Sequence, residues 1–161
     1  QHLYECLSLM EAVQYELNDP YAVALALWFH DVIYDPQAPD NELKSAELFE
    51  QLMAQDLQLD TMQKIKRWIL ATQKHAPTDE TDLQFLLDID LAILAATPER
   101  FMQYEQQIQQ EYAWVEPSLY VQKRQQVLRH FLETQPLYQT PFFQKRYERL
   151  AKQNLAQALG V

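Results

Sequence analysis

The adjacent pair His30-Asp31 combines two side chains whose types could do chemistry. An imidazole nitrogen and a carboxylate oxygen are both good ligands for a divalent metal ion. The pair follows the most apolar run of the chain, residues 21–29, where an ionised carboxylate is costly unless it is paired or bound to a cation. Two interpretations remain open at this point: part of a metal site, or a core histidine beside an aspartate that forms hydrogen bonds at a helix end.

A second carboxylate cluster, Asp88-Ile89-Asp90, lies in a segment that is otherwise almost wholly apolar. Aspartate is a poor residue for a helix interior, and it is rarely buried without a partner. Because the two aspartates are two residues apart, they point to different sides of a helix. The neighbouring leucines and isoleucines place Asp90 on the apolar side. One carboxylate could bind a metal ion while the other caps, pairs or meets solvent.

Eight helices are predicted to position these groups, from the spacing of apolar residues and of prolines. They cover about 2–17, 21–33, 40–55, 60–77, 82–95, 99–114, 118–134 and 142–159. The second of them is apolar nearly all round, which is typical of a central, buried helix. Asp19 can cap it, and Pro20 is well tolerated in its first turn. The prediction is therefore an all-α protein.

Composition supports this fold class and excludes others. The chain has 161 residues, 48% of them hydrophobic, which suits one domain with a real core. Its only glycine is Gly160, so neither a Gly-rich phosphate loop nor a tight Asn-Gly hairpin can form.

Charge and cysteine usage limit the partners and the location. The formal net charge of -10 makes long nucleic acid a poor partner, although a small nucleotide remains possible because a bound metal ion dominates the local field. One cysteine, Cys6, permits no intramolecular disulfide and suits a reducing, cytoplasmic setting. The apolar run 21–29 is too short to span a membrane, and no signal peptide is seen. Assembly into a homo-oligomer is left open.

The order His2, His30-Asp31, Asp90 resembles the H…HD…D signature of the HD superfamily of metal-dependent phosphohydrolases. The chain is most similar to a bacterial subfamily of predicted phosphohydrolases within it. The segments that carry this resemblance are 28–36, 40–42 with 45–46, 71–75, 87–94, 111–112 and 154–155. The resemblance covers essentially the whole chain.

The resemblance implies a single-domain, HD-type helical bundle in which His2, His30, Asp31 and Asp90 converge on one divalent cation. Mixed nitrogen and oxygen ligands suit Mn²⁺, Fe²⁺, Co²⁺, Ni²⁺ or Zn²⁺. The residue types do not choose among these ions, and Mg²⁺ is left open as well. Family members usually carry a Tyr/His-rich segment before the first histidine, so we expect residues upstream of Gln1. The subfamily tends to have arginine and glycine where this chain has Gln109 and Lys123, so its substrate could differ.

The activity implied by the resemblance is hydrolysis of a small phosphate ester, a nucleotide or a related metabolite. The metal ion would lower the pKa of a bound water and polarise a phosphoryl oxygen, and Asp31 could also orient the attacking water. The alternative is a non-catalytic HD-fold module that binds a nucleotide or a protein. A metal-dependent oxygenase ranks last, because it needs a second ion and more ligands.

Two further residues are candidates for catalysis. Glu42 could be a general acid or base, or could orient a ligand; otherwise it is an ordinary first-turn glutamate favoured by the helix dipole. His75 could bind a cation, face a phosphate or hold a second metal ion. Its alternative is a histidine stabilised by the dipole at a helix C-terminus.

Three basic residues are candidates for contacting substrate: Lys44, Lys74 and Arg124. Lone lysines on helices are mostly solvated, and Arg124 would form an anion-contacting pair with Tyr120. The fourth histidine, His130, has no acidic motif beside it, so it is interpreted as structural or exposed.

Overall fold

The computed structural model describes residues 1–161 and contains eight α-helices and no strand, which confirms the all-α prediction. The helices are α1 (His2–Val13), α2 (Pro20–Phe29), α3 (Asn41–Met53), α4 (Leu59–Ala71), α5 (Thr81–Asp90), α6 (Pro98–Glu111), α7 (Pro117–Glu133) and α8 (Pro141–Leu159). Two 3₁₀ segments, η1 (Gln14–Glu16) and η2 (Leu91–Ala95), follow α1 and α5.

The chain divides into two compact units, Gln1–Asp90 and Leu91–Val161. The expectation of one HD-type domain stays a prediction. No helix combines the length and the apolar character that crossing a membrane requires.

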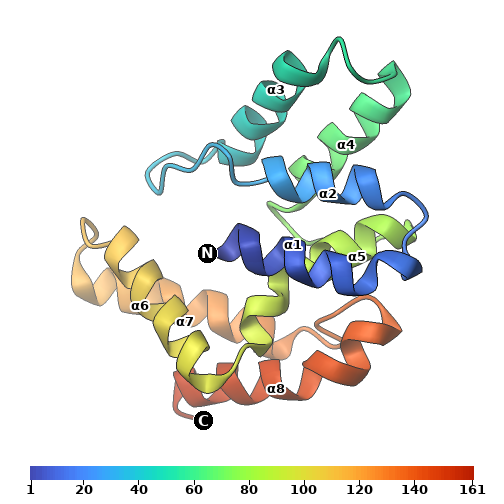
Figure 1. Ribbon diagram of the computed structural model, residues 1–161. Helices are drawn as coiled ribbons and strands as arrows, with labels where there is room; N and C mark the ends of the chain where they lie inside the picture. The colour runs from blue at the N-terminus through green and yellow to red at the C-terminus, as the bar shows by residue number, and fades with distance from the viewer. The chain divides into compact units, whose positions relative to one another are not determined.

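In the first unit, α2 is the central helix, as its all-round apolar sequence predicts. It contacts α1, α3, α4 and α5 (Figure 1). Ala22, Val23, Ala26 and Leu27 are fully buried. The predicted cap is also confirmed, because the Asp19 carboxylate accepts a hydrogen bond from the Ala22 N–H and Pro20 opens the helix. This helix is therefore a rigid support for the residue that follows it, His30.

The helices α3 and α4 pack against each other as a hairpin, joined by residues 54–58 (Figure 1). Phe49 from α3 and Ile65, Trp68 and Ile69 from α4 are buried. The pair brings Ser45 of α3 to the loop that follows α2, where it bonds to the backbone of Ile33.

In the second unit, α8 contacts both η2 and α7, and α6 contacts η2. Asn154 of α8 donates hydrogen bonds to the carbonyls of Leu94 and Ala96, at 2.9 Å each. The helices α6, α7 and α8 open on prolines, as predicted. In each, the side chain of the preceding residue accepts a hydrogen bond from the first turn; these residues are Thr97, Glu116 and Thr140.

Four helix ends differ clearly from the prediction. The helices α1 and α5 end at Val13 and Asp90 rather than at residues 17 and 95, because the chain continues there as the 3₁₀ segments η1 and η2. The helix α2 ends at Phe29 rather than near Ile33, because Ser45 Oγ accepts a hydrogen bond from the Ile33 N–H and donates one to its carbonyl, at 3.1 and 3.3 Å. The helix α4 ends at Ala71 rather than at Pro77, and His75 has a φ of 49°, outside the right-handed helical region. As a result, Asp31 and His75 lie in loops.

Candidate metal centre

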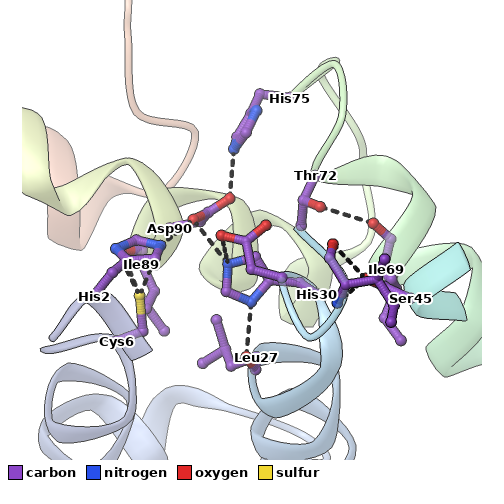
Figure 2. A network of polar contacts seen from close by, with 12 residues as sticks. His2, Cys6, Leu27, His30, Ser45, Ile69, Thr72, His75, Ile89 and Asp90 are labelled. Atoms are coloured by element: carbon purple, nitrogen blue, oxygen red, sulfur yellow. Dashed lines mark hydrogen bonds and ion pairs between the residues drawn. The ribbon is translucent and has the colours of Figure 1, made fainter. Parts of the chain in front are cut away.

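The structure brings together all four predicted ligand residues. His2 begins α1, His30 caps the C-terminus of α2, Asp31 follows it, and Asp90 ends α5. His2 Nε2 lies 2.9 Å from Asp90 Oδ1. His30 Nε2 lies 3.3 Å from both Asp31 Oδ2 and Asp90 Oδ1. Figure 2 shows the Asp90 carboxylate with His2 on one side and His30 on the other.

The imidazole of His30 is held in one orientation by its own helix. Its Nδ1 lies 2.7 Å from the Leu27 carbonyl oxygen, and because a carbonyl only accepts, Nδ1 must carry the hydrogen (Figure 2). The side chain is 2% exposed, and its Nε2 has no hydrogen-bond partner. A buried ring nitrogen thus faces two carboxylates, and this arrangement calls for a positive charge between them, a metal ion or a proton.

The pKa values show how strongly these groups interact. Burial alone would lower the pKa of His30, but the negative charges of Asp90 and Asp31 outweigh it and raise that pKa to about 11. Burial would likewise raise the pKa of Asp90, yet the charge of His30 and the hydrogen bonds from His2 and His75 hold it well below its usual value. Asp90 is therefore ionised, ready to bind a cation.

His75 is the third histidine in contact with Asp90. Its Nε2 lies 3.0 Å from Asp90 Oδ2, the oxygen that His2 and His30 do not contact (Figure 2). The left-handed backbone at His75 is strained for a residue with a side chain, and such strain is concentrated at functional sites. His75, a predicted catalytic residue, therefore lies beside Asp90 and the other predicted ligands, in a loop rather than at the end of α4.

Asp90, and not Asp88, belongs to one of the two groups of side chains that could hold a metal ion, the group with His2 and Cys6. Asp88 is also buried, at 1% exposure. The sequence left the choice between these two carboxylates open, and Asp90 as the metal ligand stays a prediction that the packing of α5 against α1 and α2 supports.

Cys6 was missed as a residue of the site. Its Sγ lies 3.6 Å from His2 Nε2, and the side chain is buried. The signal in the sequence is the spacing of His2 and Cys6, four residues apart on one helix, which puts them on one face. Burial raises the pKa of the thiol, and the charges of Asp90 and Asp31 raise it further.

Glu42 and Lys44, both in the first turns of α3, have partners outside the cluster. Glu42 Oε2 accepts a hydrogen bond from Gln73 Nε2 at 3.3 Å. Lys44 pairs with Asp40 at 2.8 Å and is half exposed. A catalytic role for Glu42 and a substrate contact for Lys44 stay predictions.

The other two predicted substrate contacts are Lys74 and Arg124. Lys74 is exposed in the turn that precedes His75. Arg124 lies on α7 in the second unit, where its guanidinium pairs with the Glu105 carboxylate through Nε and Nη2. A role for either residue in binding substrate stays a prediction.

Three contacts among the donor atoms fit the dimensions of a small coordination sphere. The atoms that all lie within 4.8 Å of one another form two overlapping groups, one of His2, His30 and Asp31 and the other of His2, Cys6 and Asp90. With metal–ligand distances of about 2.0–2.2 Å, neighbouring ligand atoms lie roughly 3–3.5 Å apart. The separations measured among His2, His30, Asp31 and Asp90 are 2.9, 3.3 and 3.3 Å. Two imidazole nitrogens and two carboxylates are also a chemically suitable set for a divalent transition metal.

Comparison with known proteins adds no relative. No protein-family model matches the chain, and neither does any curated protein or solved structure. The resemblance to the HD superfamily stays a prediction from the motifs.

Proposed function

We propose that this protein is a divalent-metal-dependent phosphohydrolase that acts on a small phosphate ester, such as a nucleotide or a related metabolite. One observation carries the proposal: His30 Nε2 is buried without a hydrogen-bond partner and faces the carboxylates of Asp31 and Asp90. A buried ring nitrogen directed at two carboxylates calls for a positive charge, which a metal ion supplies once it displaces the proton on Nε2.

In this proposal His2, His30, Asp31 and Asp90 hold the ion. When bound, the ion supplies a Lewis acid for the hydrolysis of a phosphate ester. Leu27 holds His30 so that Nε2 faces the centre, and His75 occupies Asp90 Oδ2 so that Oδ1 remains for the ion. These residues provide the pre-organised side of the centre.

Asp31 provides the solvent-exposed side of the metal centre. The exposed fractions of the four side chains are 2% for His30, 13% for Asp90, 34% for His2 and 46% for Asp31. Asp31 is thus the ligand residue that water and substrate reach most easily. Its carboxylate is the group best placed to accept the proton of an attacking water.

The class of substrate follows from charge as well as from the resemblance. With a formal net charge of -10, the chain repels long phosphate backbones, whereas the positive charge of the ion can bind one small phosphorylated molecule. The single cysteine, which forms no disulfide, suits a reducing, cytoplasmic setting as part of the same proposal.

The test is an activity screen of the full chain with added Mn²⁺, Co²⁺ or Ni²⁺. The substrates are nucleoside mono-, di- and triphosphates, p-nitrophenyl phosphate and its diester. We expect turnover that falls at least about 100-fold in Asp31→Ala and in His30→Ala. The matched control is His130→Ala, which removes an exposed histidine of α7 and should keep full activity.

Two outcomes would contradict the proposal. One is turnover that survives Asp31→Ala unchanged. The other is a folded, metal-loaded wild-type protein that hydrolyses no substrate but binds nucleotides saturably, which would indicate a binding module.

A further inference from the structure

Cys6 is the chain's single cysteine, and its surroundings are unusual for a buried thiol. It is 2% exposed, in a position where a structural cysteine would contact apolar groups. Its Sγ lies 3.6 Å from Nε2 and 3.7 Å from Nδ1 of His2, and donates a hydrogen bond to the Ile89 carbonyl oxygen at 3.9 Å. The thiol therefore points at the His2 ring, beside the metal centre proposed above (Figure 2).

The donor atoms of His2, Cys6 and Asp90 all lie within 4.8 Å of one another. An independent observation indicates that a ligand belongs here. His30 is 2% exposed, and its unpartnered Nε2 lies 3.3 Å from Asp90 Oδ1, the same oxygen that His2 contacts at 2.9 Å. The sulfur thus joins a cluster that already requires a cation.

The separation of sulfur from nitrogen fits a shared metal ion. With metal–sulfur and metal–nitrogen distances of about 2.3 and 2.0–2.1 Å, two ligands of a tetrahedral ion lie about 3.6 Å apart. The distance between Cys6 Sγ and His2 Nε2 is 3.6 Å. Because Sγ is almost equidistant from the two ring nitrogens, at 3.6 and 3.7 Å, the His2 imidazole must turn for both atoms to bind one ion. His2 stands at the start of α1 and is 34% exposed, so its side chain has room to turn while α1 stays in place.

We propose that Cys6 is a sulfur ligand of the metal centre, beside His2 and Asp90, and that the centre therefore takes a thiophilic transition ion such as Zn²⁺ or Co²⁺ in preference to Mg²⁺. This rests on the proposed function only in requiring that the centre bind a cation. The sulfur–metal bond forms as the Sγ–H proton leaves to solvent, so no oxidant or reductant takes part.

The test is the absorption spectrum of the full chain titrated with Co²⁺. A thiolate bound to Co²⁺ gives a near-ultraviolet charge-transfer band, and in a protein with one cysteine this band can come only from Cys6. We expect the band in the wild type and its loss in Cys6→Ser and Cys6→Ala, with the weaker visible bands of bound Co²⁺ retained.

Competition titrations provide a second readout. In Cys6→Ser we expect Zn²⁺ affinity to fall at least about tenfold, while Mn²⁺ affinity stays within about twofold of the wild type. The matched control is Ser8→Ala, an exposed position on the same helix, which should change neither the spectrum nor the affinities.

The outcomes separate this inference from the proposed function. Wild-type protein that binds Co²⁺ with visible bands but no charge-transfer band would overturn the role of Cys6 and leave the metal centre standing. Wild-type protein that binds no Co²⁺ at all would overturn both. If a Cys6 variant fails to fold, the wild-type spectrum still decides the question.

Discussion

A histidine binds a metal ion through a ring nitrogen that carries no hydrogen. For His30, the hydrogen bond to the Leu27 carbonyl determines that this nitrogen is Nε2. The carbonyl oxygen lies 2.7 Å from Nδ1, so the hydrogen is fixed there and Nε2 is left for a cation. Because Leu27 lies one turn earlier in α2 and is fully buried, this oxygen cannot move away without unwinding the helix.

The pKa of His30 predicts how metal affinity depends on pH. In the metal-free protein this pKa is raised from 6.5 to about 11. A raised pKa means that the proton stabilises the folded state fully below about pH 6.5, and that this contribution is lost as the pH rises toward 11. A cation must displace the same proton, so we expect its apparent affinity to rise by up to about tenfold per pH unit between pH 6.5 and 8.

Isothermal titration calorimetry with Mn²⁺ at several pH values measures how the metal affinity depends on pH. An affinity that does not change with pH over this range would contradict the assignment of His30 Nε2 as a ligand.

A substitution of His75 tests the role of the third histidine. Its Nε2 lies 3.0 Å from Asp90 Oδ2, where it orients the carboxylate. We expect His75→Ala to weaken metal binding about 10–100-fold, the usual effect of losing a group that orients a ligand. The control is Lys74→Ala, an exposed neighbour that should leave the affinity unchanged. Equal affinity in the His75 variant and the wild type would show that Asp90 needs no such support.

At the scale of the elements, α3 holds the loop that carries Asp31. Ser45 bonds to both backbone groups of Ile33. The Asn41 side chain accepts a hydrogen bond from the Asp35 N–H and donates one to the Asp35 carbonyl, at 3.0 and 2.9 Å. Two side chains of one helix thus take the place of the helical hydrogen bonds that the loop lacks, and they fix where Asp31 stands relative to α2.

Removing one of these links tests this arrangement. Ser45 is fully buried, so Ser45→Ala leaves backbone groups of Ile33 without a partner, at a cost of about 1–3 kcal/mol in the free energy of unfolding. We expect a lower midpoint in urea unfolding and weaker metal binding, because Asp31 is less well placed. The control is Ser8→Ala, at an exposed position of α1. A Ser45 variant that matches the wild type in stability and in metal affinity would contradict this role for α3.

The elements also show what sequence can and cannot predict. Helix starts were predicted well, because local signals such as Asp19-Pro20 and Thr97-Pro98 set them. The ends of α2 and α4 were not, because they depend on tertiary bonds from Ser45 and on the left-handed backbone of His75. The choice of Asp90 over Asp88 likewise depends on which face of α5 meets α1 and α2.

At the scale of the whole chain, the centre joins residues that are far apart in sequence. His2, His30-Asp31 and Asp90 come from α1, from the end of α2 and from the end of α5, all within the first unit. An ion that binds all of them is bound only by the folded state, so binding must stabilise folding.

Thermal and urea unfolding in the presence of metal ion measure this linkage. At a free ion concentration of about 100 times Kd, we expect the free energy of unfolding to rise by about 2.7 kcal/mol. A chelator should reverse the effect, and His30→Ala should abolish it. An unfolding midpoint that is the same with metal ion and with chelator would contradict binding to the folded state.

The most direct test of the centre is the metal content of the full chain, purified without chelator and measured by plasma mass spectrometry. We expect a stoichiometric transition metal in the wild type and in His130→Ala, and its loss in His30→Ala and in Asp31→Ala. An intact, folded wild-type protein that holds no metal, even after incubation with Mn²⁺, Co²⁺ or Zn²⁺, would contradict the account.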